Sequence, residues 1–175
     1  VPYMAAACEM KTKPTQHSVK ELQSEGVQPD VLVLRAEHSL AEDVRRKVAL
    51  FCNVTPDAVV ESIDVPTIYE VPLRMHDQHL DDVILRKLGI EDSEEPNLKA
   101  WSEFVEKIKN PNHKVEVALV GKYTELPDAY KSINESFIHA GAANHCKVKV
   151  LYVPAEEVTA ENAAEKLGGV SGIFV

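Results

Sequence analysis

Residues 11–16 read KTKPTQ, and their side chains suit the binding of an anion. Lys11 and Lys13 each carry a positive charge, and they stand two positions apart beside Pro14, which stiffens the backbone. If a helix follows, its first backbone N–H groups have no partner within the helix and can donate to a phosphate. Thr12 and Gln16 add a hydroxyl and an amide. The segment predicts a nucleotide-phosphate site, and the competing interpretation is a solvated loop that caps a helix.

The hydrophobic periodicity around this segment predicts alternating helices and strands. A helix is expected over 15–25, with Thr15 as its N-cap and Gly26 after its end. The next predicted elements are a strand at 30–34, a helix at 40–51, a strand at 59–63 and a helix at 74–88. This alternation predicts an α/β architecture with parallel strands and right-handed crossovers.

The composition changes after residue 90. An acidic, turn-forming stretch precedes a predicted amphipathic helix at 98–109, and the domain boundary is expected at 110–112. The elements predicted beyond it are a strand at 115–121, a helix at 128–140, a strand at 147–153, a helix at 160–167 and a strand from 172. We therefore divide the chain into a first domain portion at 1–92, a linker with a helix at 93–114 and a second domain portion at 115–175.

Both ends of the chain are expected to be internal cuts. Val1 is not an initiator methionine, and an apolar strand stops abruptly at Val175. The βαβαβ run at 115–175 is also too short to close a sheet.

Composition limits the classes of partner. The formal net charge is -9, from 19 basic and 28 acidic side chains, which argues against a general nucleic-acid-binding surface. No apolar run approaches the roughly 18 residues that span a bilayer, so no membrane partner is expected. The three cysteines lie far apart, without CxxC spacing, which predicts neither a zinc site nor a disulfide framework and favours a cytoplasmic location.

Two histidines also stand at a spacing that could bind a metal. His76 and His79 lie three residues apart, with Asp77 and Asp81 nearby, and one helical turn could present them to one ion. The simpler interpretation, a polar start of a helix, is favoured, and no metal site is predicted.

Several strings resemble the CTP synthase family. KTKPTQHSVKEL at 11–22 resembles a signature of the synthetase domain of that family. The agreement continues through QPDVLVLR (28–35), KVALFCNV (47–54), SIDVPTIYEVP (62–72) and LDDVILRKLG (80–89). VALVGKYTELPDAYKSINES at 117–136 resembles the first strand and helix of the family's glutamine amidotransferase domain. The implied fold is α/β: part of a parallel-sheet P-loop (dethiobiotin-synthetase-like) synthetase domain, followed by the first βαβαβ of a class I glutamine amidotransferase domain.

The resemblance also implies roles for individual residues. Those expected to contact UTP, or CTP as an inhibitor, are Lys11, Thr12, Lys13, Gln16 and Lys47. Lys47 is expected to complete the pocket across a subunit interface, although by itself it is typical of a lysine that snorkels from a helix. Lys122 and Lys131 are expected to serve nucleotide-dependent communication between two active sites, and Lys131 is equally typical of a helix-surface lysine.

The activity implied for the parent enzyme is ATP-dependent amination of UTP to CTP with ammonia from glutamine. Mg2+ would accompany ATP, GTP would activate the glutaminase, and the enzyme would be a homotetramer that can form filaments. The ATP loop and the magnesium ligands would precede Val1, and the glutaminase triad would follow Val175, so this chain is expected to hold no catalytic or metal-binding residue and to be inactive alone. None of the cysteines sits in the GxCxG elbow of the family's nucleophile, which predicts structural thiols. Cys8 stands where the family usually has glycine.

Two other functions stay open at this stage. The chain could be a non-catalytic pyrimidine-nucleotide-binding or filament-forming regulatory module. It could also be a dethiobiotin-synthetase-type ligase that acts on another substrate, but the uninterrupted KTKPTQ and the GKYTELPDAYKS string argue against this reading.

Overall fold

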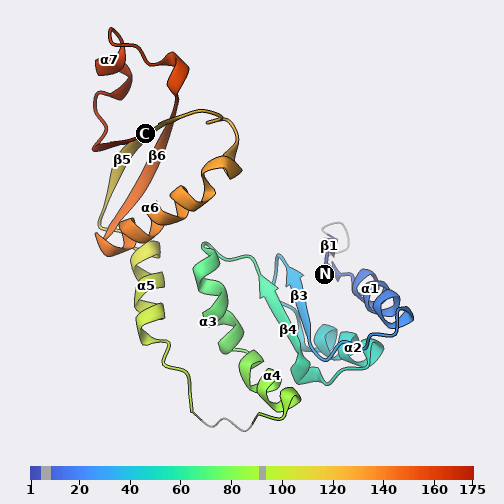
Figure 1. The fold of residues 1–175 in the computed structure, drawn as a ribbon. Helices are drawn as coiled ribbons and strands as arrows, with labels where there is room; N and C mark the ends of the chain where they lie inside the picture. Colours follow the sequence, from blue (N-terminus) through green and yellow to red (C-terminus); the bar gives the residue numbers. More distant parts are fainter. Residues whose placement is uncertain (5–8, 91–93) are drawn as a thin grey trace. The chain divides into compact units, whose positions relative to one another are not determined.

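The computed structural model describes residues 1–4, 9–90 and 94–175. The chain divides into two compact units, Val1–Leu98 and Lys99–Val175, and each is considered by itself (Figure 1). Cys8 and residues 91–93 of the predicted acidic turn lie outside the described residues. The helix predicted at 98–109 is found at Lys99–Lys109, and it belongs to the second unit.

The first unit is built around two parallel strands. Its elements are β1 (Tyr3–Met4), β2 (Glu9–Met10), α1 (Lys13–Ser24), β3 (Leu32–Ala36), α2 (Glu42–Cys52), η2 (Pro56–Ala58), β4 (Val59–Ile63), η3 (Ile68–Glu70), α3 (Val71–His76) and α4 (Leu80–Leu88). Strands β3 and β4 pair in parallel from Leu32↔Val59 to Ala36↔Ile63, with α2 as the crossover (Figure 1). The predicted parallel α/β pattern is confirmed, with the first strand two residues later than the predicted 30–34.

The core of the first unit lies between the strand pair and the two preceding helices. Val19 of α1, Leu34 of β3 and Val48 of α2 are buried in one cluster. Removing such side chains from water is the main stabilising term, about 1.5–3 kcal/mol for each large aliphatic group. Helix α2 ends at Asn53, whose left-handed backbone (φ 55°) is the expected stop signal.

The start of α1 differs from its prediction. The N-cap is Thr12 rather than Thr15, and the helix begins at Lys13 with Pro14 in its first turn. Proline suits this place because its fixed φ is helical and its missing N–H is not needed in the first turn. The helix therefore starts inside the basic KTKPTQ segment.

The single helix predicted over 74–88 is wrong, because the structure has two helices, α3 and α4. His76 ends α3, and His79 adopts a left-handed backbone (φ 59°) just before α4. The N–H groups of Gln78 and His79 donate to carbonyls three residues back, which closes α3. The side-chain amide of Gln78 donates to the Arg74 carbonyl at 3.0 Å. The same side chain bonds to the backbone of Glu61 in β4, and this tertiary contact competes with a continuous helix.

The second unit is a parallel three-stranded sheet with helices. Its elements are α5 (Lys99–Lys109), β5 (His113–Gly121), η4 (Pro127–Tyr130), α6 (Lys131–Ala143), β6 (Cys146–Pro154), η5 (Ala155–Glu157), α7 (Ala163–Leu167) and β7 (Gly172–Phe174). The strand order is β6-β5-β7, and both pairings are parallel. The predicted parallel βαβαβ run is confirmed, but the helix predicted at 128–140 begins only at Lys131, after a 3-10 turn.

Packing in the second unit places α5 and α6 together. Phe104 of α5 lies 5.0 Å from the ring of His139 on α6, and Phe137 of α6 packs edge-on against Phe174 of β7 at 5.9 Å. Leu119, in the second half of β5, is almost completely buried. In the described part of both units, no helix is long and apolar enough to cross a membrane.

Candidate functional site

The start of α1 is fixed by two hydrogen bonds between Thr12 and Gln16. The Gln16 backbone N–H donates to the Thr12 carbonyl at 3.1 Å, and its Nε2 donates to the Thr12 hydroxyl at 3.2 Å. Thr12 is only 6% exposed, so its side chain is held in place by packing as well. The predicted polar residues Thr12 and Gln16 are therefore joined in one arrangement at the first turn.

The same turn is electrostatically suited to an anion. Lys13 is exposed at the first helical position, and the first turn contains no acidic residue. The backbone N–H groups of Lys13 and Thr15 point out of the helix start, where α-helical geometry provides no acceptor. An anion in front of them also gains from the helix dipole, typically 0.3–1 kcal/mol.

A hollow lies beside this segment at the carboxyl end of β3. It measures about 400 Å³ and is lined by Val1, Pro2, Tyr3, Arg35, Ala36, Glu37 and Asp64. The backbone N–H of Lys11 donates to the Pro2 carbonyl at 3.0 Å, which places the basic segment next to the hollow. Arg35 and Asp64 form an ion pair at 2.5 Å. The carboxyl ends of parallel strands are where α/β proteins bind ligands.

Arg35 and Asp64 were not identified from the sequence. Their positions in the sequence could have predicted that they meet. Arg35 lies near the end of β3, Asp64 directly follows β4, and β3 and β4 pair in parallel. Adjacent parallel strands bring such residues to the same edge of a sheet.

Lys47 lies on another helix of the same unit. It is exposed on α2, which packs against α1. Leu50 and Phe51, one turn further along the same face, are 79% and 52% exposed. The structure thus places Lys47 beside an exposed apolar pair.

Lys122 and Lys131 flank the loop that follows β5 in the second unit. The Tyr130 hydroxyl donates to the Lys122 carbonyl at 2.6 Å, which closes the loop. A Cβ atom at Gly121 would clash with the Tyr130 hydroxyl and lie 2.9 Å from its Cζ, so glycine permits this close approach. Both lysines are exposed, Lys122 after the strand and Lys131 at the first position of α6.

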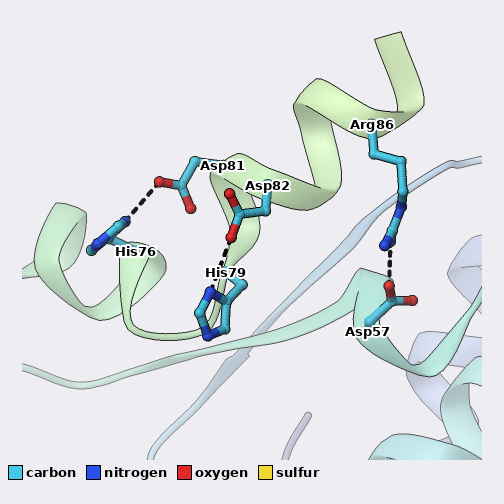
Figure 2. A network of polar contacts seen from close by, with 6 residues as sticks. All are labelled: Asp57, His76, His79, Asp81, Asp82 and Arg86. Carbon is cyan, nitrogen blue, oxygen red and sulfur yellow. Dashed lines mark hydrogen bonds and ion pairs between the residues drawn. The ribbon is translucent and has the colours of Figure 1, made fainter. Parts of the chain in front are cut away.

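The two histidines at the α3–α4 turn each contact a different carboxylate (Figure 2). His76 Nδ1 lies 2.7 Å from Asp81 Oδ2, and His79 Nδ1 lies 3.0 Å from Asp82 Oδ2. Arg86 of α4 pairs with Asp57 of η2. The two pairs are polar contacts around the start of α4, as the helix-start interpretation expects.

A metal site is not formed by these groups. Within the described ranges, no three His, Cys, Asp or Glu side chains converge to hold an ion. The resemblance places the ligands of the Mg2+ expected with ATP outside this chain, and we assign no step to a metal here.

Local contacts shift three of these acid and base pKa values. The hydrogen bond to Asp81 raises the pKa of His76. Burial acts to raise the pKa of Asp81, but the hydrogen bond from His76 and backbone donors outweigh it and lower that pKa. The hydrogen bonds from Thr55 and then Arg86 lower the pKa of Asp57. At neutral pH, Asp57 and Asp81 are thus ionised.

Cys52 and Cys146 are free thiols inside the packed units. Burial raises the pKa of the Cys52 thiol, which disfavours the reactive thiolate. The structural role of both cysteines stays a prediction.

The fold and the site together define an α/β protein with a candidate anion site at a helix start beside a parallel strand pair. Residues 1–90 match the sequence family described as "CTP synthase N-terminus", and the chain belongs to that family. The resemblance found in the sequence is thereby confirmed for the family.

Relatives extend the similarity across both units. Over all 175 residues the chain is 55% identical to a CTP synthase of Cytophaga hutchinsonii, 55% identical to one of Porphyromonas gingivalis and 56% identical to one of Bacteroides fragilis. These matches cover 100% of this chain but 32%, 32% and 33% of the relatives. The chain therefore spans about a third of the length of the curated relatives it matches.

Proposed function

We propose that this chain is an internal segment of a glutamine-dependent CTP synthase, which uses ATP to aminate UTP to CTP. The observation that carries the proposal is the start of α1, where Lys13 is exposed and the neighbouring Lys11 bonds to Pro2 in the wall of the hollow at β3. The identity to CTP synthases over residues 1–175 supports it for both units.

In this proposal the start of α1 binds the triphosphate of UTP, or of CTP as inhibitor. The Lys13 ammonium neutralises phosphate oxygens, and the backbone N–H groups of Lys13 and Thr15 donate to them. Thr12 holds the Gln16 side chain at 3.2 Å, so that the amide is oriented before the ligand arrives. Lys11 completes the positive side of the pocket.

The proposed reaction needs a leaving group on uracil. ATP transfers its γ-phosphoryl group to O4 and departs as ADP. Ammonia then forms a bond to C4, phosphate leaves with O4, and the nitrogen loses a proton to give the 4-amino group. In this proposal the residues of this chain bind and orient UTP, and none of them takes part directly in the chemical steps. Magnesium bound with ATP and activation by GTP belong to the same proposal.

Lys47 is proposed to reach the pocket of a neighbouring subunit. Its support is the exposed face of α2, where Leu50 and Phe51 remain uncovered by the first unit. Large exposed apolar side chains that cluster on one helix face are typical of protein interfaces. A homotetramer that can form filaments is the assembly we propose, in the cytoplasm.

Residues 115–175 are proposed to begin the glutamine amidotransferase domain. Their support is the parallel order β6-β5-β7 and the closed loop after β5. Lys122 and Lys131 lie at the carboxyl end of β5, a usual ligand-binding edge, and are proposed to carry nucleotide-dependent communication.

The experiment is an assay of CTP formation from UTP, ATP and glutamine by the full-length enzyme that carries this segment. The expected result is turnover, with the KM for UTP raised about tenfold or more in Lys13→Ala, because one charge-assisted contact is lost. Lys20→Ala, which removes an exposed lysine further along α1, is the matched control and should leave KM unchanged.

Two results would redirect the proposal. Absence of CTP formation by the wild-type enzyme would overturn it. Binding of UTP and CTP without turnover would favour the non-catalytic binding module instead.

A further inference from the structure

Glu61 of β4 holds the loop that joins β3 to α2. Its Oε1 accepts a hydrogen bond from the Ser39 hydroxyl at 2.8 Å, and its Oε2 accepts one from the Leu40 backbone N–H at 2.6 Å. Both carboxylate oxygens are thus used on two consecutive loop residues. Charge-assisted bonds of this kind are shorter and stronger than neutral ones.

The backbone of Glu61 is held by the side chain of Gln78. The Glu61 N–H donates to Gln78 Oε1 at 2.9 Å, and Gln78 Nε2 donates to the Glu61 carbonyl at 2.9 Å. This exchange of two hydrogen bonds imitates the pairing of a neighbouring strand. The backbone of Glu61 is therefore held in place independently of the bonds that its carboxylate makes to the loop.

The loop held by Glu61 connects two parts of the candidate site. It begins at Glu37, which lines the hollow at the carboxyl end of β3. It ends at Ala41, the N-cap of α2, the helix that carries Lys47. Leu40 between them is 6% exposed and belongs to the hydrophobic core. A shift of this loop would alter the wall of the hollow and the start of α2 together.

A second contact supports the same arrangement. The Arg45 guanidinium donates to the Val59 carbonyl from Nε at 3.1 Å and from Nη2 at 2.7 Å, and so ties the first half of α2 to the beginning of β4. Helix α2 is thus bound to β4 at Arg45, while the loop before it is bound to β4 at Glu61. The contact at Glu61 bonds the loop soon after it leaves β3, where the ring of His38 also packs against Tyr3 at 4.9 Å.

We propose that Glu61 is a positioning residue for nucleoside triphosphate binding, acting through the 37–41 loop on the hollow beside β3. This inference rests on the proposed nucleotide-binding function. Glu61 itself lies in the strand and touches the loop rather than the ligand, so its substitution should change affinity more than turnover.

The test uses Glu61→Gln in the full-length enzyme that carries this segment. Glutamine keeps the size of the side chain but loses the charge and one acceptor oxygen. Its Oε1 can accept from the Leu40 N–H only if its NH2 group turns the Ser39 hydroxyl from donor to acceptor, and both bonds lose their charge assistance. The dissociation constant and KM for ATP, UTP or both should rise about tenfold, with kcat within about twofold. Glu116→Gln, which removes a strand carboxylate paired with Lys149 in the other unit, is the matched control.

The outcomes separate this inference from the function on which it rests. Unchanged dissociation constants and KM values for both nucleotides, with only a lower melting temperature, would make Glu61 merely structural and overturn the inference. A wild-type enzyme that binds nucleotide but makes no CTP would overturn the proposed function and leave the positioning role standing, because that role is tested by the dissociation constants for nucleotide. If Glu61→Gln does not fold, Ser39→Ala removes only one of the two donors and should raise the same constants by a smaller factor.

Discussion

Thr12 and Gln16 are joined twice at the start of α1, once through the backbone at 3.1 Å and once through their side chains at 3.2 Å. The side-chain bond matters for function in our account because it orients an amide at the proposed pyrimidine nucleotide site. A helix that needed only a cap would not require the bond from Gln16 Nε2.

Thr12→Val tests this bond because it removes the hydroxyl and keeps the shape of the side chain. We expect a loss of about 1 kcal/mol in the free energy of unfolding and a higher KM for UTP. In a double-mutant cycle with Gln16→Ala, the two substitutions should couple by about 0.5–1 kcal/mol. Ser18→Ala, which removes a hydroxyl bonded to the Pro14 carbonyl in the same helix, is the control. Additive effects of Thr12→Val and Gln16→Ala on KM would contradict the idea.

The exposed apolar face of α2 predicts a subunit contact. Leu50→Glu places a charge in that face and should weaken assembly of the full-length enzyme, with a subunit dissociation constant at least about tenfold higher by sedimentation. Leu88→Glu, at a leucine of α4 that is 67% exposed, is the matched control. If Leu50→Glu leaves the assembled mass unchanged, the α2 face is not the contact.

The pair His76 and Asp81 predicts a pH-dependent stability. The pKa of His76 is raised in the folded state. Its contribution to the free energy of unfolding is therefore complete below the pKa of an unfolded histidine, about 6.5, and is lost as the pH rises through the raised pKa of the folded state. Because the pKa of Asp81 is lowered, its contribution is present above about 3.9 and is lost as the pH falls through the folded value. The pair should therefore stabilise the protein most between about pH 4 and 6.5.

Urea denaturation at pH 5.5 and pH 8 measures this contribution. In His76→Gln the midpoint should fall more at pH 5.5 than at pH 8, because only the charged imidazole benefits from the Asp81 carboxylate. His17→Gln, at an exposed histidine of α1, should leave the difference between the two midpoints as in the wild type. An equal loss at both pH values in His76→Gln would show that packing rather than charge is responsible.

The close approach of Gly121 and Tyr130 predicts a coupled pair in the second unit. Gly121→Ala should destabilise the protein by about 1–3 kcal/mol, since the new methyl group must displace the tyrosine ring from the Lys122 carbonyl. Tyr130→Ala removes the obstacle, so the double variant should lose less than the sum of the two single losses. Strict additivity in thermal or urea unfolding would contradict the contact.

The sequence predicted the framework well because its signals are local. Strand β3 begins with the apolar run Leu32, Val33 and Leu34, and Asn53 is a recognisable helix stop. The break between α3 and α4 could not be predicted, because it depends on Gln78 bonding to Glu61 in a strand 17 positions earlier.

The candidate site was predictable in part for a similar reason. Lys13 and Gln16 stand in one short string, whose composition and family resemblance both indicate a phosphate ligand. Arg35 and Asp64 come together only because β3 and β4 pair in parallel. Glu61 appeared to be an ordinary polar residue of a strand, because nothing local reveals that its carboxylate bonds to the loop at Ser39 and Leu40.

The most direct measurement is the equilibrium binding of UTP and UMP to the full-length enzyme that carries this segment, with and without Lys13→Ala. If the start of α1 holds the triphosphate, the substitution weakens UTP binding about tenfold or more and changes UMP binding much less, and the UTP effect shrinks at high salt. If Lys13→Ala weakens both nucleotides equally, or neither, the triphosphate does not bind at the start of α1.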